Sequence, residues 1–247
     1  MKADFFNSLE SPVNFYIIRH GQSEGNAAKL FQGRSESPLS ADGRLQAAAR
    51  GRSLKTIPAG RGDASLTGSA DIKGKTGRAE KAGNVLLFSS PLGRARETAE
   101  IISREASLPD PVYLDELMEM KLGIWSGKNF SQVRSADPVL WDKFMIQSWD
   151  AIPEAESSSD LYNRALLAWS VLRDAAVEQE ADKVIVVTHG GLIQWLFKTT
   201  FQCHSWFPLF SLSNCGLSRL YAEPRGQSSY MSWEEVNSPV PSSSSLC

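Results

Sequence analysis

The stretch "FYIIRHGQSEGN", residues 15–26, sets an apolar run directly before an arginine and a histidine. An apolar run such as Phe15–Ile18 is typical of a strand buried in a parallel sheet. A second stretch, "KVIVVTHGG" at 183–191, passes in the same way from apolar residues to His189. The chain has three histidines, and two of them follow a predicted strand and precede a glycine. This repeated pattern indicates a functional site at the strand ends.

A third apolar run lies at 85–88, and helical patterns separate the runs. After this run, Ala95, Ala99 and Ile102 recur at the spacing of one helix face. After the first run, Ser40 is a candidate helix cap, and a long amphipathic pattern with Ser159 or Asp160 as its cap precedes the run at 184–187. Strands alternating with helices predict an α/β fold, a three-layer α/β/α sandwich around a mostly parallel sheet.

The remaining segments divide the chain into a domain with two extensions. We expect an N-terminal extension at 1–13, one domain at 14–222 and a C-terminal extension at 223–247 with a disordered tail. The stretch "NCGLSRLYAE" at 214–223 is predicted to add a strand at or near a sheet edge. Residues 57–84 are rich in Gly, Ser and Lys and contain almost no large apolar residue, so we expect a flexible insertion. It is either a surface loop or an arm that binds substrate or a partner.

Composition excludes several classes of function. A formal net charge of -2 gives no general attraction to nucleic acid or to an anionic membrane, so an anion site must be a local group of cations. The three cysteines, Cys203, Cys215 and Cys247, form no CxxC pair, which argues against a disulfide framework and a cysteine-rich zinc site. Without a secretory signal or an apolar run of membrane-spanning length, we expect a cytoplasmic protein that binds neither nucleic acid nor membrane. Nothing in the sequence indicates an oligomeric state.

In a parallel α/β sheet, ligands bind outside the carboxyl ends of the strands. The strand at 15–18 brings Arg19 and His20 to that edge, and the strand at 184–187 brings His189. The strand at 85–88 leads to Arg94 at the beginning of the following helix. Two arginines and two histidines would then meet at one place, where they would favour an anionic ligand. A further stretch, "LDELMEMKLGIWSG" at 114–127, adds carboxylates and a glycine-rich turn.

Four motifs occur in order between residues 15 and 220: Arg-His-Gly at 19–21, followed by Asn26 and "FQG" at 31–33; "SSPLGRARETA" at 89–99; "LMEMKLGIWSG" at 117–127; and "VVTHGG" at 186–191. In these motifs the chain resembles the histidine phosphatase superfamily, in its phosphoglycerate mutase-like branch. The resemblance implies the phosphoglycerate mutase-like sandwich and a phosphate-accepting nucleophile at His20.

The resemblance also implies roles for the other motif residues. Glu119 would be the proton donor, because it matches the first position of E-x-x-x-G-x-W-x-G, whereas Glu116 is out of register. The remaining catalytic and substrate-binding contacts to the phosphoryl oxygens and the substrate would come from Arg19, Arg94, His189, Asn26, Gln32, Gly33 and Gly190.

The chain departs from the family pattern at three places. Gly25 stands where a tryptophan is common, "IPEAES" at 152–157 replaces Gly-Gly-Glu-Ser, and the 57–84 insertion is long. The first two departures affect the substrate contacts rather than the phosphoryl chemistry. We therefore expect a phosphomonoester hydrolase that uses no cofactor or metal and acts on a small phosphorylated metabolite. "LGIWSG" resembles the phosphatase type of the family. The alternatives are a phosphoglycerate mutase and an inactive module that binds phosphate or phosphopeptide.

Physical chemistry supports these roles independently. Phosphoryl transfer depends on positioning and on cations around the equatorial oxygens, and arginine's planar fork suits such contacts. A histidine nucleophile must be neutral, which nearby arginines favour, with its other nitrogen held by an acceptor such as a backbone carbonyl. Two histidines and a carboxylate are also the ligands of a non-haem iron site, but Arg19 and Arg94 would repel a cation there.

Aromatic residues outside the motifs are open to two interpretations. Trp141, Phe144 and Trp149 either cover the site as an apolar lid or simply pack. His204 is expected to lie on the surface or in the core without a catalytic role. Four aromatic residues near the end of the chain are expected in the core: Trp195, Phe197, Phe201 and Trp206.

Overall fold

A six-stranded sheet forms the centre of the molecule in the computed structural model, which describes residues 6–55 and 84–241. The strand order is β3-β2-β4-β1-β5-β6. The strands are β1 (Val13–Arg19), β2 (Asn84–Ser89), β3 (Val112–Tyr113), β4 (Ala181–Thr188), β5 (Leu217–Arg225) and β6 (Ser228–Ser238). Of the expected insertion at 57–84, only Asn84 is among the described residues, and the end of the expected tail, 242–247, is outside them.

The centre of the sheet is parallel, as predicted. β4 pairs in parallel with both β1 and β2, and β2 pairs in parallel with β3. Antiparallel pairing occurs on the other side, where β5 pairs with β1 and β6 pairs with β5. Arg19 is the register partner of Thr188, so β1 and β4 end side by side. This register brings the residues that follow the two strands to the same edge of the sheet.

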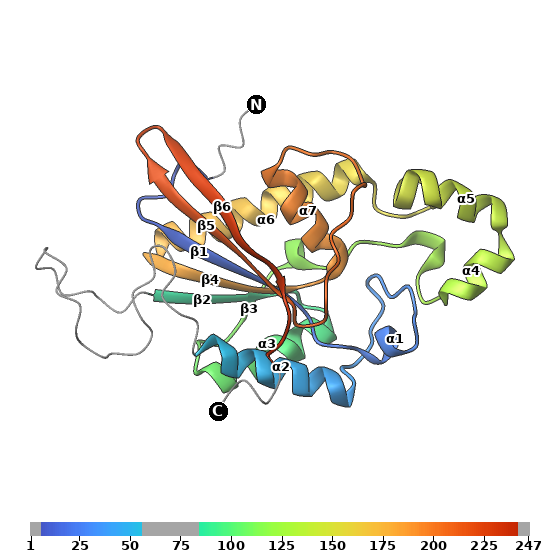
Figure 1. Cartoon of the computed structure of the whole chain (residues 1–247), viewed down its shortest axis with the longest axis horizontal. Helices are drawn as coiled ribbons and strands as arrows, with labels where there is room; N and C mark the ends of the chain where they lie inside the picture. Colours follow the sequence, from blue (N-terminus) through green and yellow to red (C-terminus); the bar gives the residue numbers. More distant parts are fainter. Residues whose placement is uncertain (1–5, 56–83, 242–247) are drawn as a thin grey trace, which may run out of the picture.

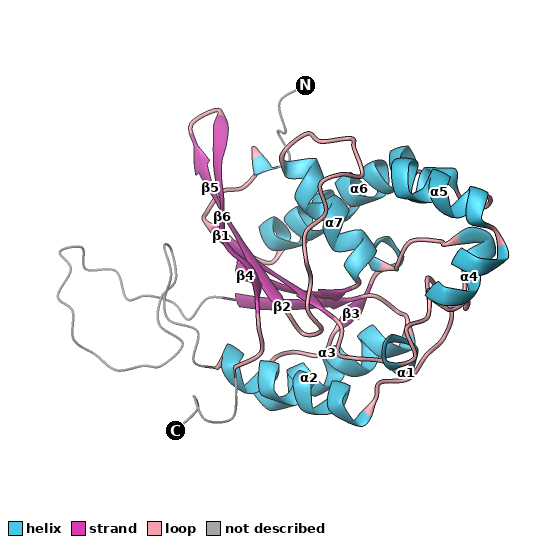
Figure 2. Cartoon of the chain, turned by 45° about the vertical axis from the view of Figure 1, so that its right-hand side comes forward, coloured by secondary structure: helices cyan, strands magenta, loops and turns pink. Residues whose placement is uncertain are grey.

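Helices cover both faces of the sheet and complete the predicted sandwich (Figure 1). α2 (Ala41–Leu54) and α3 (Gly93–Ala106) lie on one face, and α6 (Ser158–Glu178) and α7 (Gly190–Thr200) lie on the other (Figure 2). Ala95, Ala99 and Ile102 are buried against the α2–α3 face of the sheet, as their spacing predicts. The larger apolar cluster, which includes Trp169 and Trp195, lies on the α6–α7 face.

Side-chain caps fix where two of these helices begin. Ser40 Oγ accepts a hydrogen bond from Gly43 N at 3.0 Å, so the predicted cap of α2 is confirmed. The predicted cap of α6 was wrong by two residues or more. Ser157 is the N-cap, and its Oγ accepts from Asp160 N at 3.1 Å. Asp160 therefore lies inside the first turn of the helix, where an acidic side chain is favoured by the helix dipole.

Both expected extensions contain residues that pack into the domain. Phe6, although within 1–13, is fully buried and lies 5.3 Å from Phe15 between ring centroids. The predicted strand at 214–223 corresponds to β5, and β6 beyond it forms the sheet edge. Trp233 of β6 packs on Phe197 with a centroid separation of 4.3 Å. The boundary expected at residue 222 thus falls inside β5, because a half-buried edge strand rich in Ser and Glu has little apolar signal.

Three short helices lie beyond the carboxyl end of the parallel strands, at the right of Figure 1: α1 (Glu24–Ala27), α4 (Phe130–Ala136) and α5 (Pro138–Gln147). The chain between α5 and α6 forms a short 3-10 helix, η4 (Ser148–Ala151). Two further 3-10 helices, η2 (Asp115–Leu117) and η3 (Gly123–Trp125), flank the segment that contains Glu119. Among the described residues, no helix combines the length and the apolarity needed to cross a membrane.

Candidate active site

His20 follows β1 directly and is almost completely buried. Its backbone N–H donates to Thr188 O at 2.8 Å, which ties it to the end of β4. Its Nδ1 lies 2.6 Å from Gly21 O. A carbonyl oxygen can only accept, so Nδ1 carries the proton and the lone pair is on Nε2. Arg94 Nε donates toward that nitrogen at 3.3 Å. The expected neutral imidazole, held by a backbone carbonyl, is therefore the arrangement in the structure.

The surroundings of His20 favour the neutral ring. Burial is the largest cause that holds the pKa of His20 well below its ordinary value, and the charges of Arg94 and Arg19 act in the same direction. The hydrogen bond to Gly21 opposes this effect only in part. A neutral imidazole with its lone pair on Nε2 is the form that can attack an electrophile.

Arg19 and Arg94 are both oriented by backbone carbonyls rather than by carboxylates. Arg94 Nη1 donates to Ser35 O at 3.0 Å and Nη2 to Gly33 O at 2.6 Å. Arg19 Nη1 donates to Leu212 O at 2.6 Å, and its Nε is buried with no hydrogen-bond partner in the described part of the chain. Within that part, neither guanidinium forms an ion pair with a carboxylate. Two buried cations without a paired anion make this a site for an anionic group.

His189 follows β4 and packs beside His20, with 5.1 Å between ring centroids. The side chain is fully buried, and its Nε2 lies 2.7 Å from Ser90 Oγ. Its Nδ1 is buried and has no partner among the described residues. Burial, followed by the charges of His20 and the arginines, holds the pKa of His189 well below its ordinary value. His189 is therefore a neutral ring that adjoins His20.

Glu119 reaches the site from the segment between η2 and η3, and main-chain amides fix its carboxylate. Oε2 accepts from Gly191 N at 3.1 Å, and Oε1 accepts from Leu192 N at 3.2 Å and from Met120 N at 2.9 Å. Two of these amides belong to the first turn of α7, whose N-terminus favours an anionic group. A side chain at Gly191 would collide with Oε1, so the second glycine of "THGG" makes room for this carboxylate.

Glu116 has no comparable place in the site. Its backbone oxygen accepts from Arg164 Nη1 at 3.0 Å, and its side chain is absent from the lining of the cavity described below. The same arginine donates to Met118 O at 2.7 Å and forms a two-point ion pair with Glu156. Glu156 belongs to "IPEAES", so this departure from the family pattern keeps the glutamate that anchors the segment before Glu119.

The other predicted contacts also reach the site. Asn26 Oδ1 accepts from Ser23 Oγ at 3.0 Å and lies 3.3 Å from Asn214 Nδ2. Gln32 Oε1 accepts from the same hydroxyl at 2.8 Å. A side chain at Gly25 would collide with the side chain of Gln32, so a glycine fits at this position. Gly33 and Gly190 line the site through their backbones.

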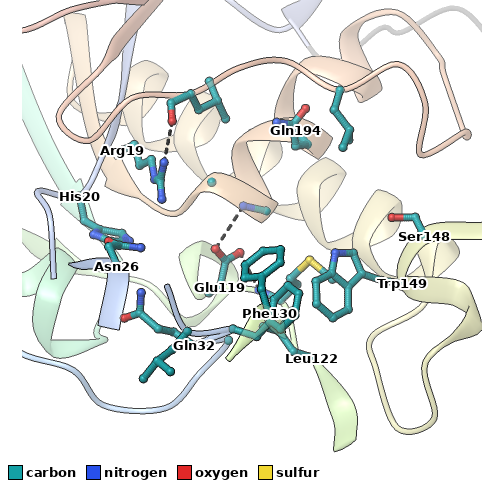
Figure 3. Close-up of a pocket in the computed structure, with 18 of the residues that line it drawn as sticks. Arg19, His20, Asn26, Gln32, Glu119, Leu122, Phe130, Ser148, Trp149 and Gln194 are labelled. Atoms are coloured by element: carbon teal, nitrogen blue, oxygen red, sulfur yellow. Dashed lines mark hydrogen bonds between the residues drawn. The ribbon is translucent and has the colours of Figure 1, made fainter. Parts of the chain in front are cut away.

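One cavity of about 390 Å³ is lined by most of the predicted site residues: Arg19, His20, Asn26, Gln32, Gly33, Arg94, Glu119 and Gly190. His189 does not line it but packs against His20. In Figure 3, Arg19, His20 and Asn26 lie on one side of the cavity, and Phe130, Leu122 and Trp149 lie on the other, with Glu119 between them. A cavity of this size is typical of a small-molecule site. The predicted site residues thus come together at one place.

The aromatic segment at 128–157 both packs and borders the cavity. Phe144 and Trp149 line it, whereas Trp141 stacks behind them on Trp125 at 5.9 Å. Of the four aromatic residues expected in the core, three are buried, but Phe201 is 60% exposed, because it caps the end of α7. His204 is exposed and stacks on Tyr162 at 3.9 Å.

The alternative of a non-haem iron site needs two histidines and a carboxylate arranged around one metal ion. Among residues 6–55 and 84–241, no set of three or more His, Cys, Asp and Glu side chains is arranged to hold a metal ion. Glu119 is bound to the α7 amides, and the two arginines adjoin His20. The groups around His20 are suited to an anionic ligand.

Sequence reasoning missed three contributors to the site. Gly191 and Leu192 supply amides to Glu119, and the doubled glycine after His189 was the available signal. Asn214 Nδ2 lies 3.2 Å from His20 O, a contact across a separation that no local pattern reveals. The apolar wall, which the sequence left open as a lid of Trp141, Phe144 and Trp149, also takes Phe31 from the "FQG" motif and residues of α4 and of the loop after α7.

The chain is similar to known proteins over most of its length. The family model of the histidine phosphatase superfamily (branch 1) matches residues 15–66 and 59–234. The probable phosphoglycerate mutase GpmB of Escherichia coli O1:K1 is 28% identical over 211 residues, which are 84% of this chain and 84% of that protein.

Solved structures share the fold. YhfR of Bacillus stearothermophilus is 26% identical with a TM-score of 0.66, and the match covers 90% of this chain and 96% of that one. A mycobacterial glucosyl-3-phosphoglycerate phosphatase is 23% identical with a TM-score of 0.70, and the match covers 92% and 99%. At 23% identity, the similarity to the mycobacterial phosphatase shows only a common fold.

Proposed function

This chain belongs to branch 1 of the histidine phosphatase superfamily, and we propose that it hydrolyses small phosphomonoesters through a phosphohistidine at His20. The observation that carries the proposal is the tautomer of His20. Gly21 O holds the protonated Nδ1, so the lone pair is on Nε2, and His20 has to give up only the 3.3 Å hydrogen bond from Arg94 Nε before it attacks. The ring needs no separate base before it attacks phosphorus.

In the first step, Nε2 of His20 bonds to phosphorus as the bond from phosphorus to the alcohol oxygen breaks. Arg19 and Arg94 stabilise the charge on the equatorial oxygens, and neutral His189 adds a contact beside them. Glu119 takes up a proton when the negatively charged phosphate binds beside it, and it gives that proton to the departing alkoxide. The products of this step are the free alcohol and the phosphorylated His20.

In the second step, the Glu119 carboxylate takes a proton from water as the water oxygen bonds to phosphorus. The N–P bond breaks, its electron pair returns to Nε2, and inorganic phosphate leaves. Glu119 is again a carboxylic acid and His20 is again neutral. The arginines supply the positive charge that a metal would otherwise bring, so the proposed reaction is metal-independent. The proposed location is cytoplasmic.

Phosphoglycerate isomerisation is the second candidate function, because the E. coli relative is named a probable mutase. A mutase must protect its phosphohistidine from water until the intermediate has reversed its orientation. The motif "LGIWSG" at 122–127 resembles the phosphatase type of the family rather than the mutase type. We therefore place hydrolysis first.

Both functions can be measured in one assay with a chelator present. The purified protein is incubated with a panel of phosphomonoesters and with 3-phosphoglycerate, with and without the 2,3-bisphosphoglycerate primer, while inorganic phosphate and 2-phosphoglycerate are followed. We expect phosphate release that needs neither primer nor metal and that His20→Ala abolishes. Efficient primer-dependent isomerisation with little phosphate would overturn the proposal. Absence of any turnover would favour the inactive binding module.

A further inference from the structure

The cavity at His20 has two halves of different chemistry. The half around His20 carries both cations, Arg19 and Arg94, with Asn26 beside them. The other half, which we call the apolar half, is lined by Phe31, Phe130, Phe144 and Trp149, and Trp206 and Leu209 add apolar lining from the loop after α7. Figure 3 shows Phe130 and Trp149 on the side of the cavity away from Arg19 and His20. A phosphomonoester bound with its phosphate at His20 would extend its alcohol into the apolar half.

The charges along the cavity lining oppose a second anionic group on the substrate. Arg19 and Arg94 are the only lysine or arginine side chains that line the cavity among the described residues, and both belong to the half around His20. Glu119 stands between the halves (Figure 3). A carboxylate or second phosphate in the apolar half would lose water without gaining a cation, which is strongly unfavourable.

The apolar half also offers few groups that could replace water around sugar hydroxyls: Ser148, next to Trp149 in Figure 3, contributes one hydroxyl. Gln194 lines the cavity, but its side chain is already used: Nε2 donates to Phe210 O at 2.7 Å, and Oε1 accepts from Phe210 N at 2.9 Å. Buried hydroxyl groups without partners would therefore weaken the binding of a polyhydroxylated alcohol.

Aromatic rings give the apolar half its shape. Phe31 and Phe130 lie 3.8 Å apart between centroids, and Phe144 meets Trp149 at 5.0 Å in a nearly perpendicular arrangement. At the rim, Phe130 and Leu209 come from different segments and remain 47% and 51% exposed. Large apolar side chains left exposed at the mouth of a cavity are typical of a surface that an apolar ligand covers.

We propose that the substrate of this site is the phosphomonoester of an apolar, aromatic alcohol, whose ring occupies the apolar half while its phosphate lies at His20. The inference rests on the proposed function. It excludes phosphoglycerates and sugar phosphates as preferred substrates.

A matched pair of substrates tests the preference. 2-Phenylethyl phosphate and 3-phosphoglycerate are both esters of alkyl alcohols, so each needs a protonated leaving group, but only the second carries another anion. We expect kcat/KM to be on the order of 10²-fold higher for 2-phenylethyl phosphate. Equal values, or a preference for 3-phosphoglycerate, would overturn the inference while phosphate release still upheld the proposed hydrolase.

A pair of variants locates the preference in the apolar half. Leu209→Arg adds a cation at an exposed rim position, and we expect it to lower the ratio of the two kcat/KM values about 10-fold. Ile146→Arg is the control, because Ile146 is 77% exposed on α5 and does not line the cavity. A ratio unchanged in Leu209→Arg, or changed equally in the control, would contradict the placement of the ring.

Binding of non-hydrolysable probes separates this inference from the activity itself. Calorimetric titration with 2-phenylethylphosphonate and with 2-carboxyethylphosphonate needs no turnover. We expect the phenyl compound to bind more tightly by on the order of 10-fold or more. Such a preference in a protein without phosphatase activity would uphold the apolar half and contradict the hydrolase. Turnover without this preference would uphold the hydrolase and contradict the role of the apolar half in substrate choice.

Discussion

Glu119 and His20 are separated by almost a hundred residues but line one cavity, and each is held by main-chain groups. Gly21 O fixes the tautomer of His20, while the first-turn amides of α7 fix the carboxylate of Glu119. Backbone anchoring of this kind orients both groups without a carboxylate partner that would neutralise the arginines. At the residue scale, the proposed division of labour is a nucleophile at one position and an acid at the other.

The role of Glu119 can be measured through the leaving group. Glu119→Gln should lower kcat about 10²–10⁴-fold on an alkyl phosphate, because the departing alkoxide needs a proton. The loss should be much smaller on 2,4-dinitrophenyl phosphate, whose leaving group is stable without one. Glu116→Gln is the matched control and should retain activity on both substrates. Equal losses of Glu119→Gln on both substrates, or a larger effect at Glu116, would refute the assignment.

At the scale of elements, Arg164 connects α6 to the segment that presents Glu119. It donates to two backbone carbonyls of that segment and forms the ion pair with Glu156, and both side chains are less than 15% exposed. By contrast, Arg44 of α2 pairs with Glu97 of α3 at the surface. The Arg44 side chain is 50% exposed, and the Glu97 side chain is 32% exposed. When one partner of a buried ion pair such as Arg164–Glu156 is removed, the other charge stays buried without a partner.

Arg164→Leu should therefore lower the free energy of unfolding by about 3 kcal/mol, whereas Arg44→Leu should cost less than about 1 kcal/mol. Because the backbone at 116–118 also loses two donors, kcat should fall in Arg164→Leu and not in Arg44→Leu. Urea denaturation and steady-state rates of both variants check this. Similar unfolding free energies for the two variants would show that the Arg164 network does not hold the segment.

Sequence patterns predicted the elements that carry strong local signals. The three apolar runs became β1, β2 and β4, and Ser40 caps α2. β6 was missed, because its Ser- and Glu-rich sequence is stabilised by pairing with β5 and by Trp233 packing on Phe197. Phe6 was likewise assigned to an extension, since its burial depends on Trp169 from a distant helix.

In the candidate site, too, the residues that lie in local motifs were predicted, and those that depend on tertiary contacts were not. Arg19, His20, Arg94, Glu119 and His189 were identified because each lies in a short motif at a strand or helix end. The apolar half of the cavity was left open, because a sequence does not say whether Phe144 and Trp149 border a cavity or fill a core. Their spacing is the same in both cases, and only the tertiary arrangement decides.

For the whole molecule, two buried neutral histidines link the site to stability. Burial first, and then nearby positive charge, holds the pKa of His20 and of His189 well below the ordinary value. In the unfolded chain both rings return to a pKa of about 6.5. Below that pH, the unfolded chain binds protons that the folded chain does not. The free energy of unfolding must then fall as the pH decreases, by up to about 1.4 kcal/mol per pH unit for each ring.

Urea denaturation between pH 7 and pH 5 should show this loss of stability, and His20→Asn should have a shallower dependence than the wild type. If His20→Asn kept the wild-type slope, His20 would not be a buried neutral ring in the folded protein.

The most direct test of the account is to trap the phosphoryl group on the protein. Wild-type enzyme is mixed with ³²P-labelled substrate, denatured rapidly in base, and digested to locate the label, with His20→Ala treated in parallel. We predict an acid-labile, base-stable label on His20 that the variant lacks. A label on a serine, or equal labelling of the variant, would contradict the phosphohistidine mechanism.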